Sequence, residues 1–321
     1  MKRVSIIGPI NADIMVVGNY GGDWKGNFEW ESPAEIEFYS AGSSGYTIQD
    51  FNRLGSRTRI FSSVGNDVFG KYIVDQLKAE EIDTDLLSVE KGNTALAVYW
   101  LMHGNKKRPM AFKMSNFNPW KSEISRQQID RLLDCDLLHC GGYLHYSAMY
   151  NGITSEIFKT AHERNIITSI DTQFPLSADV HKPWSHYMED IIPYVDVLIM
   201  DENEARAMTG DVDLDECAKK MIQMNGKIVV IKMGEKGSLI YSKEDKIVQK
   251  AIKIGDTIDT IGAGDAFGAA FMTYYMENKP LEICAKFAAA FAGFTVTASG
   301  GIKGAPDRIT VEEYLDKSHL W

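Results

Sequence analysis

Short apolar segments rich in β-branched residues alternate with longer amphipathic segments along most of this 321-residue chain. Each apolar segment has the length of a strand, and each amphipathic segment repeats its buried positions with the period of a helix. Strands that alternate with helices in this way predict a mainly parallel sheet covered by helices on both faces. The expected strands cover residues 4–8, 59–64, 136–140, 166–170, 195–200 and 227–233.

The segments between these strands carry helical patterns. One helix is expected to begin near Thr47, where Ile48, Phe51 and Leu54 share one face. Gly55 ends it, because glycine readily adopts the backbone conformation that closes a helix. In a sheet of this kind ligands bind at the carboxyl ends of the strands, so polar residues that follow strands are candidate functional residues. Further helices are expected over 68–77, 153–162 and 202–208.

Two regions break the alternation and predict a small antiparallel sheet outside the main one. Residues 36–40, 95–102 and 110–114 alternate between faces and are rich in aromatic side chains. We expect residues 14–41 and 94–118 to form a β-flap that acts as a lid, the alternative being an edge extension of the main sheet. Its exposed apolar face predicts a homodimer contact. The whole chain, 1–321, is then one α/β domain that carries a flap.

Charge and cysteine content exclude several function classes. The net charge of −10 argues against binding nucleic acid. None of the four cysteines belongs to a CxxC pair, so buried free thiols in a reducing compartment are expected. No stretch approaches the roughly 20 apolar residues of a membrane span, and Pro9 interrupts the first apolar run, so no signal peptide is expected. A cytoplasmic enzyme without membrane or nucleic-acid partners is predicted.

The most specific motif reads Asp-Thr-Ile-Gly-Ala-Gly-Asp-Ala-Phe over 259–267. The small residues Gly262, Ala263 and Gly264 precede an apolar helix expected over 266–276. Unpaired backbone N–H groups and the dipole at a helix N-terminus form a site suited to phosphate. Asp265 lies beside that site, where a carboxylate is poorly placed unless it acts as a base. The alternative is an aspartate that caps the helix after a flexible turn.

This motif resembles the second signature of the ribokinase-like (PfkB) carbohydrate kinases, Asp-Thr-x-Gly-Ala-Gly-Asp-x-Phe. The resemblance extends over essentially the whole chain and implies a ribokinase-like α/β fold. It implies an ATP-dependent kinase that phosphorylates a hydroxymethyl group of a small sugar-like molecule. By the same resemblance Gly262, Ala263 and Gly264 form the anion hole, and Asp265 activates the acceptor hydroxyl.

Two N-terminal segments are similar to sugar-binding elements of that family. Asn11 and Asp13, in a turn after the first strand, resemble its sugar-binding turn, which implies that Asp13 accepts hydrogen bonds from the substrate with Asn11 nearby. Gly42 and Ser43 fall in a segment that resembles the first signature and are assigned to the substrate on that basis. The family commonly has asparagine where this chain has Tyr46, so a non-ribose ligand or a different pose is expected.

Two later segments resemble nucleotide and metal elements. Asp201 and Glu204 follow a strand as the family's Asn-x-x-Glu element does, which implies that Asp201 lies at the nucleotide and that Glu204 orders Mg²⁺ through water. The alternative is an acidic helix start, which the helix dipole favours. Lys232, Gly234 and Gly237 resemble the turn that contacts ATP, where glycine allows close backbone approach.

Two positions leave cation and nucleotide binding open. Asp259 and the loop at 299–301 occupy the places of a monovalent-cation site in related kinases, which allows K⁺, and a turn role for Asp259 is the alternative. The family often has asparagine near the adenine, where this chain has Ala289. Adenine is then expected to be held by packing and backbone contacts.

The predicted reaction is in-line phosphoryl transfer from ATP with Mg²⁺. Asp265 takes the hydroxyl proton, and the amides of the small-residue turn neutralise charge on the transferred group. Two other functions stay open: a nucleoside kinase of the same fold, and a non-catalytic sugar or nucleotide sensor suggested by Tyr46 and Ala289. Asp265 argues against the sensor, since a binding protein needs no base. The flap aromatics that could stack a nucleobase are Tyr99, Trp100, Phe112, Phe117 and Trp120.

Overall fold

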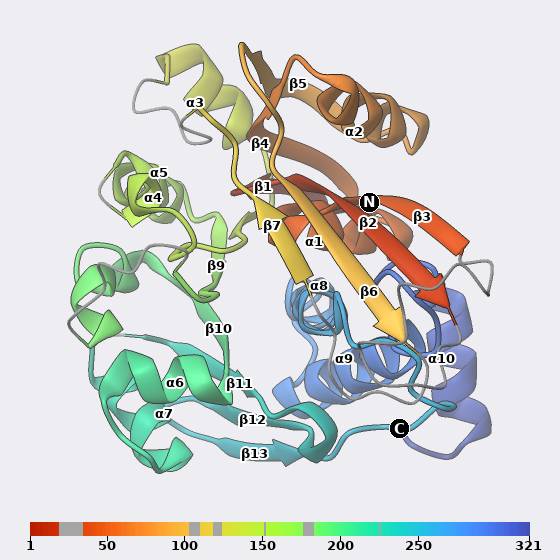
Figure 1. Cartoon of the computed structure of the whole chain (residues 1–321). Helices are drawn as coiled ribbons and strands as arrows, with labels where there is room; N and C mark the ends of the chain where they lie inside the picture. Colours follow the sequence, from red (N-terminus) through yellow and green to blue (C-terminus); the bar gives the residue numbers. More distant parts are fainter. Residues whose placement is uncertain (19–34, 103–109, 118–123, 151, 176–182, 225) are drawn as a thin grey trace.

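The structure, a computed structural model, describes residues 1–18, 35–102, 110–117, 124–150, 152–175, 183–224 and 226–321. The strands of its large sheet are β1 (Arg3–Ile7), β4 (Arg57–Gly65), β5 (Asp83–Glu90), β8 (Leu137–Cys140), β9 (Ile167–Asp171), β10 (Val197–Asp201), β11 (Ile228–Lys232), β12 (Ser238–Tyr241) and β13 (Lys246–Gln249). Their order across the sheet is β13-β12-β11-β10-β9-β8-β1-β4-β5 (Figure 1). Pairing is parallel from β5 to β11, and β12 and β13 are added antiparallel. The expected mainly parallel sheet is confirmed.

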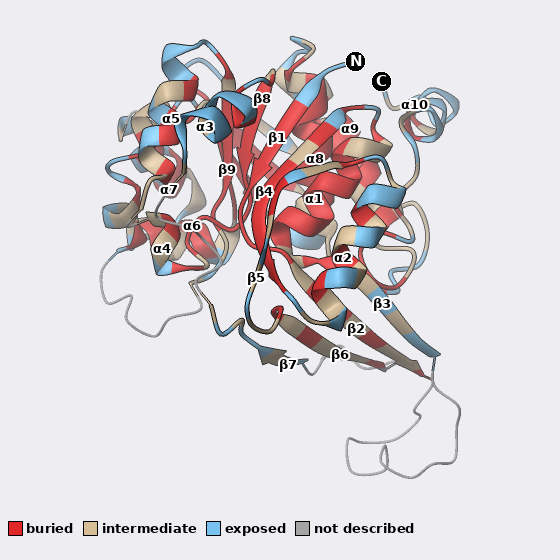
Figure 2. Cartoon of the chain, turned by 90° about the horizontal axis from the view of Figure 1, so that it is seen from above, coloured by how far each residue is buried: buried red, intermediate tan, exposed pale blue. Residues whose placement is uncertain are grey.

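Helices cover both faces of this sheet, because successive strand residues point to opposite faces. Buried strands therefore lie in the middle of the molecule, with exposed residues on the outer sides of the helices (Figure 2). In the described part of the chain, no helix is long and apolar enough to cross a membrane. One face is covered by α1 (Gly42–Arg53), α2 (Val68–Ala79), α8 (Ala263–Tyr275), α9 (Leu281–Thr295) and α10 (Arg308–Lys317). The other is covered by α3 (Arg126–Leu132), α4 (Ser147–Tyr150), α5 (Thr154–Glu163), α6 (Glu202–Thr209) and α7 (Leu214–Gln223).

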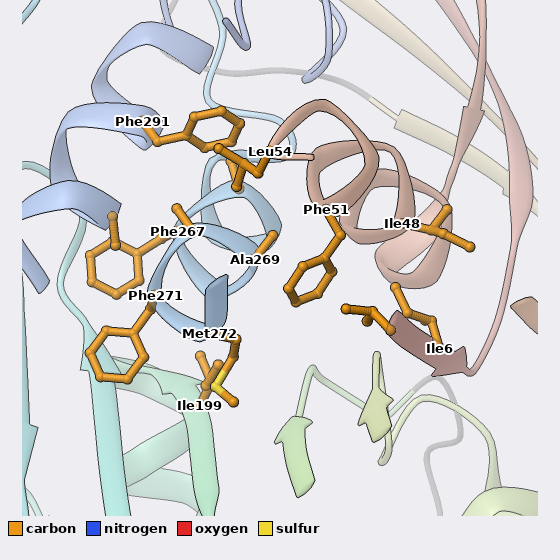
Figure 3. Packing of buried hydrophobic residues seen from close by; sticks show 14 of the residues in the cluster. Ile6, Ile48, Phe51, Leu54, Ile199, Phe267, Ala269, Phe271, Met272 and Phe291 are labelled. Carbon is orange, nitrogen blue, oxygen red and sulfur yellow. The ribbon is translucent and has the colours of Figure 1, made fainter. Parts of the chain in front are cut away.

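The core under α1, α8 and α9 fixes the helix that carries the most specific motif. Phe51 of α1 and Ala269 of α8 face each other, Phe291 comes from α9, and Ile6 and Ile199 rise from the sheet (Figure 3). Small residues on α8 let the helices approach closely, which aligns its N-terminus with α1. The four cysteines are buried and free, as the sequence predicted.

A second sheet of four strands lies outside the main one. It consists of β2 (Asn11–Gly18), β3 (Glu35–Ala41), β6 (Leu96–Met102) and β7 (Met110–Lys113), in the order β3-β2-β6-β7. Its presence confirms the separate small sheet that was expected. Two of its pairings are antiparallel, but β2 and β6 pair in parallel, so the sheet is mixed. Residues 19–34, 103–109 and 118 of the expected flap lie outside the described residues.

Three boundaries differ from the sequence prediction. Asn11 and Asp13 do not lie in a turn, because β2 begins at Asn11 and pairs with β3 along its length. Helix α1 begins at Gly42 rather than near Thr47, and its glycine-rich first turn is stabilised by tertiary packing that overrides low helix propensity. Helix α8 begins at Ala263, so Asp265 lies within its first turn.

Candidate active site

The small-residue turn before α8 has a backbone that requires glycine. Gly262 adopts a φ of +71° and caps the helix. A Cβ atom at this position would lie 2.9 Å from the Cα atom of Gly301. Only glycine meets both conditions at low cost. The turn therefore packs directly against the loop that contains Gly301.

The amides at the start of α8 make few backbone hydrogen bonds. Within the described residues, the amide of Ala263 has one long backbone contact, 3.4 Å to the carbonyl of Thr260, and no backbone carbonyl accepts from the amides of Gly264 or Asp265. Residues 262–265 are all partly exposed. This is the arrangement that an anion site at a helix N-terminus requires.

Asp265 is held by α1 and does not cap α8. The hydroxyl of Ser43 donates to its Oδ1 at 3.0 Å, and that of Thr47 lies 3.5 Å from the same atom. The cap of α8 is Gly262, with no capping side chain. The capping alternative is therefore wrong. Ser43, which the sequence assigns to the substrate, donates to the carboxylate of Asp265, and its contact with a substrate stays a prediction.

The surroundings of Asp265 suit a base that works near neutral pH. Burial, with Asp171 as a second cause, raises the pKa of Asp265 to about 7, although Lys232 and the two hydroxyls act in the opposite direction. A base is most effective when its pKa lies near the working pH, because it is then both ionised and strongly basic.

A buried ion pair lies beside the turn, at the carboxyl ends of β9 and β11. Lys232 Nζ is 2.5 Å from Asp171 Oδ2. A Cβ atom on Gly264 would lie 3.1 Å from the same Nζ, so the ammonium is close to the predicted anion hole. Burial works to lower the pKa of Lys232, but Asp171 and other carboxylates raise it above its usual value, so the ammonium stays charged. The sequence had not identified Asp171 as a site residue.

Asp201 and Glu204 form a capping box at the start of α6. Asp201 Oδ1 accepts from the amides of Asn203 and Glu204, at 2.7 and 2.8 Å, and Glu204 Oε2 accepts from the amide of Asp201 at 2.8 Å. The acidic helix start that was the alternative interpretation is thus present. Burial and, next, the charge of Asp171 raise the pKa of Glu204 to about 7.

The carboxylates at these strand ends fit a lightly held magnesium ion. In the described part of the chain no group of three or more His, Cys, Asp or Glu residues could hold a metal. Mg²⁺ bound through phosphates and water needs only one or two protein carboxylates. Glu204 is buried, its carboxylate is destabilised by nearby negative charge, and a cation would favour its ionised form.

Asp259 holds together the two loops beside the small-residue turn at 262–264, here called the anion turn. Its Oδ1 accepts from the amide of Ile261 and its Oδ2 from the amide of Gly300, both at 3.0 Å. These bonds are the turn role that was the alternative to a K⁺ site. Binding of K⁺ by Asp259 stays a prediction.

The expected substrate residues meet at the start of β2. Asn11 Nδ2 donates to Asp13 Oδ1, and the hydroxyl of Tyr46 donates to Asp13 Oδ2, both at 2.6 Å. A Cβ atom on Gly42 would lie 2.4 Å from Asn11 Oδ1, so Gly42 packs on this group. Asp13 and Asp265 are therefore connected to one helix, α1, through Tyr46 and Ser43.

The expected nucleotide turn lies between β11 and β12. Gly234 and Gly237 both have positive φ, +58° and +102°. A Cβ atom on Gly237 would lie 1.9 Å from the carbonyl oxygen of Gln249, so packing against β13 already requires glycine there. Ala289 is buried in the core on α9. Contacts of these residues with a nucleotide stay predictions.

The small sheet is attached to the loop after α9 by Glu37, which the sequence had not indicated. Its carboxylate accepts from the hydroxyl of Tyr39 at 2.6 Å, the hydroxyl of Ser299 at 2.9 Å and the ammonium of Lys303 at 2.5 Å. On the same side Met15 packs in a cluster with Ile261, directly before the anion turn. The small sheet thus contacts the loops that form the candidate site.

A surface groove of about 970 Å³ lies at the opposite ends of the strands. It is lined by the first residues of β9 and β11, Ile167 and Ile228, and by Asp196, Lys227 and Lys279 among others. None of the predicted site residues lines it.

Comparisons with known proteins identify relatives of this chain. The pfkB family carbohydrate kinase model matches residues 1–308. A ribokinase of Arabidopsis thaliana is 25% identical over 267 residues, 80% of this chain and 67% of its own. A nucleoside kinase of Methanocaldococcus jannaschii is 24% identical over 297 residues, 92% of this chain and 91% of its own.

Solved structures show the same fold. A. thaliana ribokinase complexed with ribose and ATP superposes with a TM-score of 0.79 at 23% identity, covering 98% of each chain. Fructokinase with bound ATP from Xylella fastidiosa superposes with a TM-score of 0.81 at 16% identity, covering 99% of each chain. Because the family model spans nearly the whole sequence, this chain belongs to the pfkB family of carbohydrate kinases.

Proposed function

We propose that this protein transfers the γ-phosphoryl group of ATP to a hydroxymethyl group of a small sugar or sugar derivative. The observation that carries the proposal is the first turn of α8, where amides without backbone partners adjoin the carboxylate of Asp265. Relatives described as ribokinase, fructokinase and nucleoside kinase support the same reaction class.

The chemistry follows from the positions of these groups. Asp265 Oδ2 accepts the proton of the acceptor hydroxyl as that hydroxyl attacks, while Ser43 holds Oδ1 and fixes the carboxylate. The amides of Gly262, Ala263 and Gly264 stabilise negative charge on the transferred group. Lys232, beside Gly264, adds positive charge. Glu204 would orient Mg²⁺ through water, and the bound ion would neutralise further charge on the phosphates.

The small sheet supplies the lid in this proposal. The acceptor lies beneath this lid, between Asp13 and Asp265. Closure of the lid excludes water and limits ATP hydrolysis. Asp201, Gly234 and Gly237 border the nucleotide on the other side. We further propose a cytoplasmic homodimer that pairs through the small sheets, with each chain forming one kinase domain.

A nucleoside is the second candidate for the acceptor. In the strand register, Ala97 pairs with both Asp13 and Phe112, so Phe112 shares the face of Asp13. Tyr99 pairs with Met15, two residues from Asp13, and therefore lies on the same face. Trp100 pairs with Val16 on the opposite face. Trp120 lies outside the described residues.

An acceptor panel tests the proposal. Purified protein is incubated with ATP, Mg²⁺ and, separately, ketoses, aldoses, short polyols, sugar acids and nucleosides, with ADP followed by a coupled assay and the phosphorylated product by mass spectrometry. Phosphorylation of a sugar or polyol is expected, and a preference for nucleosides selects the second candidate. Saturable ligand binding with no product from any acceptor would replace the kinase with a sensor. Repeating the panel with K⁺ or Na⁺ tests the role of Asp259.

A further inference from the structure

Tyr46 lies between the two carboxylates that flank the proposed acceptor site. Its neighbours on α1, Ser43 and Thr47, direct their hydroxyls to Asp265, whereas the hydroxyl of Tyr46 donates to Asp13. The charge of Asp265 is also one of the influences on the phenol of Tyr46. A molecule that reaches from Asp265 toward Asp13 therefore meets Tyr46.

Tyr46 and Asn11 each donate a hydrogen bond to one carboxylate oxygen of Asp13. Burial, with the charge of Asp13 as the next cause, raises the pKa of Tyr46 well above its usual value, so the phenol keeps its proton and donates it. The other carboxylate oxygen of Asp13 accepts from Asn11. Asp13 is 1% exposed and Tyr46 is 4% exposed. Toward an acceptor the phenol oxygen offers only lone pairs.

The ring of Tyr46 is held in place from several sides. It packs with Met15, Ile261 and Ile302 in one buried cluster. A Cβ atom on Gly301 would lie 3.1 Å from its Cε1 atom, which places the backbone of that loop directly against the ring. Moving the ring aside would expose a large buried aromatic surface and break the bond to Asp13. The side chain therefore acts as a fixed wall.

We propose that Tyr46 determines acceptor size by closing the α1 side of the site, so that the protein selects short hydroxymethyl compounds such as glycerol or dihydroxyacetone over full pentoses and hexoses. The proposal rests on the proposed function, because it takes the acceptor hydroxyl to lie at Asp265. The two parts of the Tyr46 side chain have different roles in this proposal. The ring excludes longer acceptors, and the hydroxyl holds Asp13 in place.

The test compares Tyr46→Asn, which removes the ring, with Tyr46→Phe, which keeps it. Tyr241→Phe on β12 is the matched control. Binding of D-ribose, D-fructose, glycerol and dihydroxyacetone is measured by calorimetry with a non-hydrolysable ATP analogue, and kcat/KM is measured with ATP. Tyr46→Asn is expected to gain roughly 10- to 200-fold in affinity for D-ribose or D-fructose. Tyr46→Phe and the control are expected to gain nothing.

Two results overturn the proposal. One is a wild-type protein that binds D-ribose or D-fructose as tightly as the short compounds. The other is a Tyr46→Asn protein, folded by circular dichroism, that binds the longer sugars no better than the wild type does. If Tyr46→Asn does not fold, Tyr46→Ser takes its place, and the wild-type preference still decides. Improved sugar binding without phosphoryl transfer in any variant would refute the kinase function and leave the wall intact.

Discussion

The basicity of Asp265 depends on two neighbours of opposite sign. After burial itself, Asp171 raises the pKa of Asp265, and Lys232 lowers it. The two neighbours also form an ion pair with each other, at 2.5 Å. Removing either one therefore changes the field at Asp265 in a direction that can be stated in advance.

We predict opposite shifts of the pH profile for Asp171→Asn and Lys232→Met. Asp171→Asn removes a like charge and leaves Lys232 unpaired, so the pKa of Asp265 falls and activity persists to lower pH. Lys232→Met removes an opposite charge, so the pKa of Asp265 rises. Activity then begins to fall at a higher pH than in the wild type as the solution is acidified. The acid limb of kcat/KM, near pH 7 in the wild type, is expected to move by roughly one pH unit in each direction.

Lys227→Met is the control for these variants. Lys227 pairs with Asp196 at 2.5 Å, at the amino ends of β11 and β10, and its loss should leave the acid limb in place. Shifts of both test variants in the same direction, or no shift in either, would contradict the electrostatic account of Asp265.

Local sequence identified Asp265 and its turn, but it did not identify the partners of that aspartate. The small residues and the aspartate are contiguous, so one motif contains them. Asp171 and Lys232 are 61 positions apart and meet only because β9 and β11 both flank β10. The one available signal was a carboxylate at the carboxyl end of a buried strand. Ser43 was found, but its partner was not, because α1 and α8 are packed together by the core.

At the scale of elements, the small sheet is attached through one half-buried carboxylate, that of Glu37. Glu37 joins β3 to the loop after α9 through Ser299 and Lys303, and it accepts a further hydrogen bond from Tyr39 within β3. Although burial opposes them, these three donors hold the pKa of Glu37 below its usual value. In the same loop, the amide of Gly300 donates to one carboxylate oxygen of Asp259. The amide of Ile261, directly before the anion turn, donates to the other. The position of the small sheet and the shape of the turn are therefore physically connected.

We predict that Glu37→Ala weakens acceptor binding and uncouples ATP hydrolysis from phosphoryl transfer to the acceptor. Loss of the two hydrogen bonds that tie this carboxylate to Ser299 and Lys303 lets the small sheet open, so water reaches the site. KM for the acceptor is expected to rise about tenfold or more, and the ratio of ADP to phosphorylated product to rise with it. Asp75→Asn, which removes an exposed pair with Lys71 on α2, is the control. Unchanged KM and unchanged coupling in Glu37→Ala would mean that this attachment does not hold the lid.

The elements of the main sheet were predictable because their signals are local. Buried parallel strands read as β-branched apolar runs, and the structure places them within a few residues of the expected positions. The early start of α1 and the parallel pairing of β2 with β6 were not predictable. Both depend on contacts between segments distant in sequence, which outweigh the local preferences of glycine and of alternating residues.

For the whole molecule, the outer face of the small sheet is the feature that suggests assembly. Ile36 and Phe38, 61% and 47% exposed, lie on the face opposite to Asp13, because they pair with Val16 and Ile14. Burying such residues against a second copy would cover apolar surface that the single chain leaves in water.

We predict that the wild-type protein is a dimer and that Ile36→Lys makes it a monomer. The free energy needed to bury an unpaired charge in an apolar contact exceeds the free energy that the contact contributes. Sedimentation velocity over a concentration series measures the state, and Val248→Lys, at a similarly exposed position on β13, serves as the control. A monomeric wild type, or an Ile36→Lys dimer of unchanged affinity, would contradict the proposed interface.

The most direct test of the account is the single-turnover rate of phosphoryl transfer by Asp265→Asn. The variant keeps the shape of the side chain and removes the base, so ATP affinity and melting temperature should stay close to those of the wild type. The transfer rate should fall by about 10²- to 10⁴-fold, while Asp256→Asn, a fully exposed site in the same segment, transfers normally. Transfer by Asp265→Asn at the wild-type rate would contradict the central claim.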